Sequence, residues 1–100
     1  MSRPLQFTAA TRADIADAYD WYEEQRTGLG EEFRSELNVA FTLLSEFSEA
    51  GPTVHLNVRR LLLRRFPYAV YYRVVGAEIE VRGCLHLHRD PRAWHQRTDA

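Results

Sequence analysis

The hydrophobic residues of this chain change their spacing once, and that change restricts the fold more than any other feature of the sequence. Between residues 11 and 47 they recur every three or four positions, as in amphipathic helices, whereas from residue 59 they alternate, as in strands. The chain has 100 residues and no long Gly-, Pro- or Ser-rich break. It is therefore predicted to form one α+β domain over residues 1–100, with residues 95–100 as a frayed end.

Two helices are predicted in the first half of the chain. Thr11 is placed as the N-cap of the first helix, which is expected to end near Arg26 because two glycines fall within residues 27–30. The second helix is predicted to open on Glu31-Glu32 and to stop before Gly51-Pro52. So short a loop requires an antiparallel hairpin. The apolar stripe of the second helix consists of Phe33, Leu37, Ala40, Phe41, Leu44 and Phe47.

Strands are predicted over residues 59–65, 69–75 and 78–87, and the alternating residues 5–9 are predicted as a first strand. The expected order is β-α-α-β-β-β, in which an antiparallel three-stranded C-terminal sheet and the N-terminal strand carry the helical hairpin on one face. The core is expected to join Phe33, Leu37, Phe41 and Leu44 to Leu61, Leu63, Val70, Tyr72, Val81 and Leu85.

The turn at Gly76 sets the register of the last two strands. A two-residue loop with glycine at the position that needs positive φ is typical of a type II′ hairpin. The resulting pairs are Val74 with Ile79, Tyr72 with Val81, Val70 with Gly83 and Tyr68 with Leu85. The opposite face then pairs Arg73 with Glu80 and Tyr71 with Arg82. The same alternation places Cys84, His86 and His88 outward, together with Arg60, Leu62 and Arg64 from the preceding strand.

Charge is distributed unevenly along the chain. Residues 1–50 carry ten acidic residues and four arginines, whereas residues 51–100 carry nine arginines, four acidic residues and all four histidines. The sequence contains no lysine; an arginine-favouring genome and a need for planar guanidinium donors are both compatible with this. Cys84 is the only cysteine, no apolar run is long enough for a membrane span, and the N-terminus lacks a signal-peptide pattern. A cytoplasmic location is expected.

Four segments follow one another along the chain: DIADAYDWYEEQ, GLGEEFRSEL, VRRLLLRRFPYAVYYRV and a final H-x-x-R-D-P-x-x-W. In this order they resemble the RelE/ParE toxin superfamily, and the resemblance runs from about residue 5 to residue 94. The resemblance implies the toxin of a type II toxin–antitoxin system, sometimes called a plasmid stabilisation protein, which is neutralised by a small antitoxin from the same operon. RelE-like members cleave mRNA on the ribosome, whereas ParE-like members poison DNA gyrase. The helical hairpin and the WYE and FPY segments favour the ParE-like branch, and the missing lysines count against the ribonuclease. A non-toxic, degenerate member is the third alternative.

Several residues are candidates for function. For a ribonuclease, the acid–base and phosphate-binding candidates are His86, Arg82, Arg73 and Arg89, because imidazole titrates near neutral pH and guanidinium stabilises phosphoryl charge. A structural role for His86 and Arg89 in tying down the tail is the alternative. Trp21 and Tyr22 are candidates for antitoxin binding. No metal site and no cofactor is expected, since no ligand set completes the pair His86 and His88. The candidate target-binding residues are Arg60, Arg64, Tyr71, Arg73, Arg82 and His88.

Overall fold

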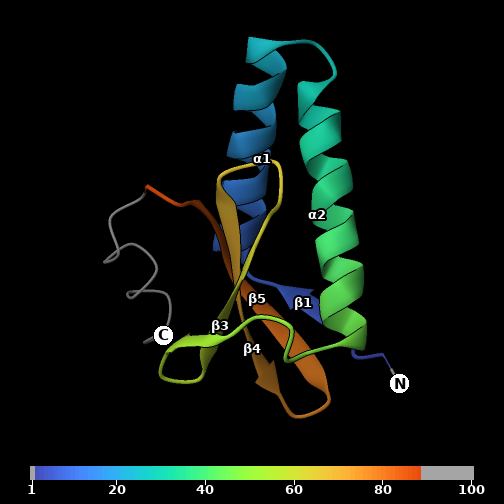
Figure 1. Cartoon of the computed structure of the whole chain (residues 1–100), viewed down its shortest axis with the longest axis vertical. Coiled ribbons are helices and arrows are strands. Elements are labelled where there is room, and N and C mark those ends of the chain that lie inside the picture. Colours follow the sequence, from blue (N-terminus) through green and yellow to red (C-terminus); the bar gives the residue numbers. More distant parts are fainter. Residues whose placement is uncertain (1, 89–100) are drawn as a thin grey trace.

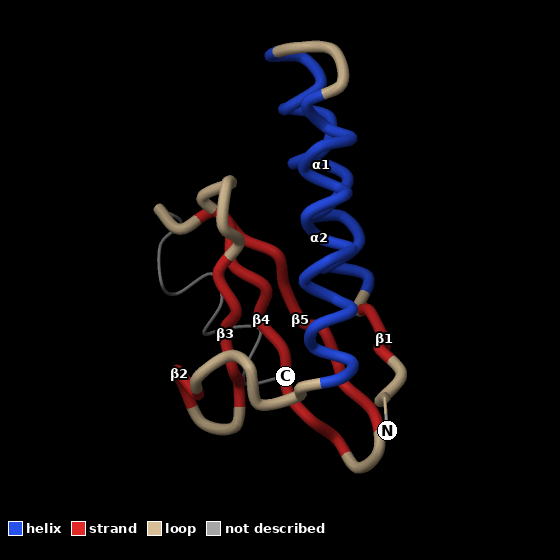
Figure 2. The backbone as a smooth tube through the Cα atoms, turned by 45° about the vertical axis from the view of Figure 1, so that its right-hand side comes forward, coloured by secondary structure: helices blue, strands red, loops and turns tan. Residues whose placement is uncertain are grey.

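A computed structural model describes residues 2–88 of the chain. A five-stranded sheet forms one layer, and an antiparallel pair of helices packs on one of its faces (Figures 1 and 2). The tip of this helical hairpin extends beyond the end of the sheet (Figure 1). The elements in chain order are β1 (Leu5–Phe7), α1 (Ala9–Gln25), α2 (Leu29–Glu46), β2 (Thr53–His55), β3 (Val58–Leu62), β4 (Tyr68–Val75) and β5 (Glu78–His86).

The sheet has the strand order β1-β5-β4-β3-β2. β1 lies parallel to β5, and the other neighbours are antiparallel. The predicted α+β class, the helical hairpin and the N-terminal strand are confirmed. The sequence did not predict β2, which is only three residues long and pairs with β3 through two residue pairs.

The helix ends differ from the prediction by a few residues. Thr8, not Thr11, caps α1, and its hydroxyl accepts a hydrogen bond from the Thr11 backbone N–H at 3.1 Å. Thr11 lies inside the helix, fully buried, and its hydroxyl donates to the carbonyl of Val81. The Thr11 side chain therefore fastens α1 to β5. The C-cap of α1 is Arg26, as predicted.

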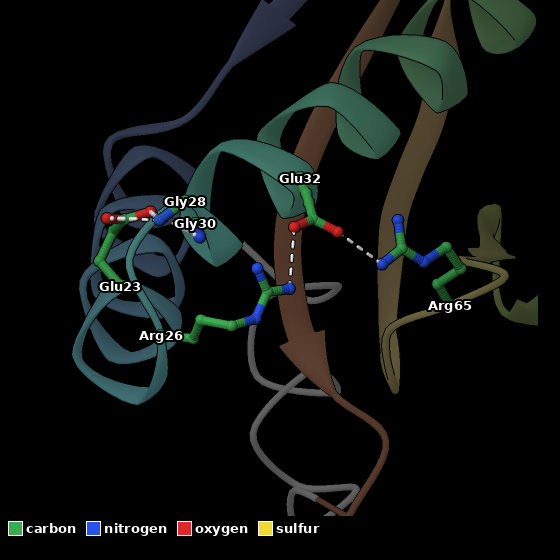
Figure 3. Close-up of polar contacts among 6 residues, drawn as sticks. All are labelled: Glu23, Arg26, Gly28, Gly30, Glu32 and Arg65. Atoms are coloured by element: carbon green, nitrogen blue, oxygen red, sulfur yellow. Dashed lines mark hydrogen bonds and ion pairs between the residues drawn. The ribbon is translucent and has the colours of Figure 1, made fainter.

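The loop between the helices depends on two glycines and one carboxylate. Gly28 has φ of +92°, a left-handed conformation that favours glycine. The Glu23 carboxylate accepts hydrogen bonds from the backbone N–H groups of Gly28 and Gly30, at 3.0 and 2.8 Å (Figure 3). α2 consequently begins at Leu29, two residues before the predicted start.

The main core lies between the helices and the sheet. Of the predicted core residues, Phe33, Leu37 and Leu44 on α2 are fully buried, and Phe41 packs at the margin. The prediction for Phe47 was wrong, because α2 ends at Glu46 and the Phe47 side chain is 61% exposed. The sheet contributes the predicted Leu63, Val70, Tyr72 and Val81, with Leu61 partly buried.

A β-bulge changes the register in the middle of the β4–β5 hairpin. The predicted pairs of Val74 with Ile79 and of Tyr72 with Val81 are present, but Tyr71 pairs with Gly83, so Arg82 is an extra residue in β5. The pairing beyond the bulge is shifted by one residue, which reverses the side-chain directions predicted for it. Cys84 joins the core under the helices, and Leu85 joins a separate cluster on the opposite face. The placements of Leu85, Cys84 and His86 in the sequence prediction were therefore wrong.

Candidate functional site

On the face of the sheet away from the helices, three charged side chains of β4 and β5 contact one another. Arg73 Nε donates to Glu80 Oε1 at 2.9 Å, and Arg82 NH1 forms a short hydrogen bond to the same oxygen. Burial alone raises the pKa of Glu80, but the hydrogen bonds from Arg82 and Arg73 outweigh it and hold the pKa below its usual value. Two guanidinium groups thus share one ionised carboxylate, and the group keeps one net positive charge.

A small apolar cluster lies beside this charged group on the same face. It consists of Val58, Ala69, Tyr71 and Leu85, with Val54 partly buried against it. Tyr71 is 3% exposed, so its ring supports the face and offers little surface to a target. Arg60 pairs with Tyr71 in the sheet register and therefore shares this face. It is partly exposed and forms no ion pair within residues 2–88.

The structure separates His86 from the arginines with which it was expected to act. His86 pairs with Tyr68 on the helix-facing side, beyond the bulge, and the two rings lie 5.3 Å apart at an angle of 79°. Arg73 and Arg82 lie on the opposite face. The exposed His88 follows the strand, with its backbone N–H donating to His86 Nδ1 at 3.1 Å. Arg89 lies outside the described residues. The structure therefore does not bring His86 together with Arg73 and Arg82 around one reacting group.

Arg64 also lies apart from the other predicted target-binding arginines. It follows β3 and lines a groove of about 400 Å³ between α2 and β3. The groove exposes three apolar side chains: Val39 is 68% exposed, Leu43 40% and Leu62 50%. The sequence prediction missed Val39 and Leu43. Their i, i+4 spacing was a usable signal, because it marks a second apolar stripe on α2 beside the buried one.

A network on the first turns of α2 holds the β3–β4 turn in place. The Glu32 carboxylate accepts hydrogen bonds from Arg26 on one side and Arg65 on the other, each at 2.8 Å (Figure 3). These bonds, from Arg65 first and then Arg26, lower the pKa of Glu32. The Glu36 carboxylate accepts from the Arg65 backbone N–H at 3.1 Å. The turn that bears Arg64 is thereby attached to α2.

The two residues predicted to bind an antitoxin lie in different environments. Tyr22 belongs to the core, where its ring contacts Phe33 and Phe66. Trp21 is 54% exposed and packs edge-on against Tyr22 with 5.1 Å between ring centroids. Only Trp21 therefore offers a large side-chain surface to a partner.

The sequence matches a family model over residues 5–91, and that model describes the ParE toxin of the type II toxin–antitoxin system parDE. The chain belongs to the ParE toxin family. The fold agrees with this assignment. A solved structure entitled "Chromosomal ParDE TA system from P. aeruginosa" superposes with a TM-score of 0.75, covering 85% of this chain and 96% of that one. The sequence identity is 24%. No curated protein matches the sequence.

Residues 2–88 contain no group of three or more His, Cys, Asp or Glu side chains arranged to hold a metal ion. Among the described helices, none is both long enough and apolar enough to cross a membrane. The side chains described above define two surfaces, the arginine-bearing sheet face and the groove between α2 and β3.

Proposed function

We propose that this ParE-family protein is the toxin of a toxin–antitoxin pair, that it arrests growth by binding DNA gyrase in the cytoplasm, and that a cognate antitoxin neutralises it. Membership of the family supports the toxin role. The observation that carries the choice of mechanism is the position of His86 on the helix-facing side of the sheet, away from Arg73 and Arg82. A ribonuclease needs a proton acceptor and donor beside the scissile phosphate. A gyrase poison needs a complementary surface.

The arginine-bearing face supplies such a surface. Arg73 and Arg82 are both held by Glu80, which fixes their guanidinium groups, while Arg60 is partly exposed and forms no ion pair within the described residues 2–88. Clustered arginines of this kind favour acidic patches on a partner and speed association with it. We assign target binding to Arg60 and Arg73. Arg82 is 8% exposed, so it holds Glu80 in place and offers little surface to a target. Tyr71 supports this face from within.

The test is inducible expression in a host that lacks the antitoxin, with DNA-break signalling and nascent protein synthesis measured in the first minutes. The proposal expects early DNA breaks while translation continues. Early translational arrest with mRNA cut at ribosome-bound codons would establish the ribonuclease alternative instead. Normal growth would identify a non-toxic family member.

A pair of charge reversals adds a matched control. Arg60→Glu should strongly reduce toxicity, because it inverts charge on the proposed target surface. Arg12→Glu makes the same change on an exposed position of α1 and should leave toxicity unchanged. Equal effects of the two variants on toxicity would mean that this face of the sheet is not the target-binding surface.

A further inference from the structure

The turn between β2 and β3 holds a leucine in a strained backbone conformation. Leu56 has φ of +50°, and within residues 2–88 it is the only residue other than glycine with a positive φ. In this left-handed region the Cβ of an L-residue comes close to a backbone carbonyl, so glycine or asparagine is favoured there. The turn of the β4–β5 hairpin also needs a positive φ, of +60°, and its residue is Gly76. The chain thus uses glycine in one hairpin turn and a strained leucine in the other.

The Leu56 side chain is turned to solvent, so packing does not offset the strain. It is 67% exposed and belongs to neither of the two apolar clusters of the described residues. Val54, two residues earlier, and Val58, two residues later, both pack in the cluster on the face away from the helices. Asparagine at position 56 would remove the strain and the exposed apolar surface at once. The fold alone therefore does not account for leucine here, whereas contact with another molecule would.

The β2–β3 hairpin is held at its base. The side chain of Tyr72 is fully buried, and its hydroxyl donates to the Ser48 carbonyl and accepts the Gly51 N–H, each at 2.9 Å. The Arg59 guanidinium donates to the Gly51 carbonyl at 2.8 Å. Gly51 lies so close to β3 that a Cβ there would come within 2.5 Å of the Arg60 carbonyl oxygen. A side chain at the tip of a hairpin fixed in this way loses little conformational freedom on binding.

The same hairpin carries part of the arginine-bearing face. β3 begins at Val58, whose side chain is buried in the apolar cluster of that face, and Arg60 follows on the same strand. The hairpin forms one edge of the sheet (Figure 2). Exposed leucine beside arginine suits a protein partner, in which an apolar centre is surrounded by polar contacts. Nucleic-acid phosphates would pair with the arginines and leave Leu56 in water.

We propose that Leu56 is an apolar anchor of the target-binding surface, and that it enters an apolar depression on DNA gyrase flanked by carboxylates that face Arg60 and Arg73. The inference rests on the proposed function, which supplies the target. It adds the side chain that provides the apolar contact, beside the arginines that orient the partner.

The test measures two properties of the purified full chain, its melting temperature and its affinity for immobilised, purified DNA gyrase. Leu56→Asn should raise the melting temperature by about 4 °C, because asparagine tolerates a positive φ. The same change should weaken gyrase binding by about tenfold, because the apolar contact is lost. A residue that served only the fold would not give a more stable protein that binds less tightly.

Two further variants serve as controls. Leu56→Met keeps an apolar side chain on the strained turn, so it should keep both the melting temperature and the gyrase affinity close to those of the native protein. Leu87→Asn makes the same substitution at an exposed leucine outside the target-binding surface. Leu87 is 41% exposed and has no positive φ, so its substitution should neither raise the melting temperature nor weaken gyrase binding.

The possible failures are distinguishable. If Leu56→Asn binds gyrase as tightly as the native protein, or no less tightly than Leu87→Asn, the inference is overturned and the proposed function stands. A Leu56→Asn protein that melts earlier than the native protein would also overturn it, because the backbone strain that motivates the inference would be absent. If the native protein itself does not bind gyrase, the proposed function fails, and the role of Leu56 fails with it.

Discussion

The two faces of the sheet are stabilised in different ways. On the helix-facing side, Tyr22, Phe33 and Phe66 pack with ring centroids 4.9–5.3 Å apart within a continuous apolar core. The opposite face has a cluster of four buried residues beside the arginines that share Glu80. Substitutions on the first face should therefore act on stability. Substitutions of the exposed groups on the second should act on recognition.

The bulge at Arg82 produces much of this difference. One extra residue in β5 turns Leu85 away from the helices and gives the second face its apolar cluster. It also turns Cys84 and His86 toward the helices, which removes the histidine from the arginine-bearing face. A single irregularity in a strand thus determines which chemical groups can act together.

The largest effect is expected in the core. Leu37→Ala should lower the free energy of unfolding by about 2–5 kcal/mol, because Leu37 is fully buried on α2 and its truncation leaves a cavity. Val39→Ala, two residues away on the same helix and 68% exposed, should cost no more than about 0.5 kcal/mol. Urea unfolding of both variants measures the contrast. Equal losses would mean that the assignment of buried and exposed stripes on α2 is wrong.

A thiol-labelling experiment tests the side on which Cys84 lies. Burial raises the pKa of the Cys84 thiol to about 12, and the charge of Asp14 adds to the shift. Asp14 also accepts the Cys84 backbone N–H at 3.0 Å, which fixes this part of β5 against α1. Alkylation at pH 8 should be slower in the native protein than in denaturant by at least roughly a hundredfold. If the native protein were alkylated as fast as the denatured protein, Cys84 would have to lie on the outward face.

The sequence predicted the structure correctly where a local pattern allowed only one interpretation. The stripe at Phe33, Leu37 and Leu44 predicted the buried side of α2, and Gly76 predicted the hairpin turn and the first register pairs correctly. The fold class and the family resemblance also held. The stripe on α2 and the turn at Gly76 depend on residues close together in the chain, so their physical causes are visible in the sequence.

The errors arose where tertiary contacts decided between alternatives. The alternation of apolar and polar residues continues without a break through Arg82 and Gly83. The only sequence signal for a bulge was therefore the glycine within the strand. Thr8 and Thr11 are both residue types that cap helices. The Thr11 hydroxyl is used in the hydrogen bond to Val81, a tertiary contact that the sequence does not show. The groove beside β3 was missed because it needs α2 and β3 in place together.

The most direct test asks whether the arginine-bearing face is needed for toxicity and is not needed for antitoxin binding. Growth is followed after induction of Arg60→Glu and of Arg12→Glu, each alone and with the antitoxin co-expressed. Arg60→Glu should permit growth while still binding the antitoxin, whereas Arg12→Glu should arrest growth alone and be neutralised when the antitoxin is present. If Arg60→Glu folds and remains fully toxic, or if Arg12→Glu is equally harmless, the assignment of target binding to this face is contradicted.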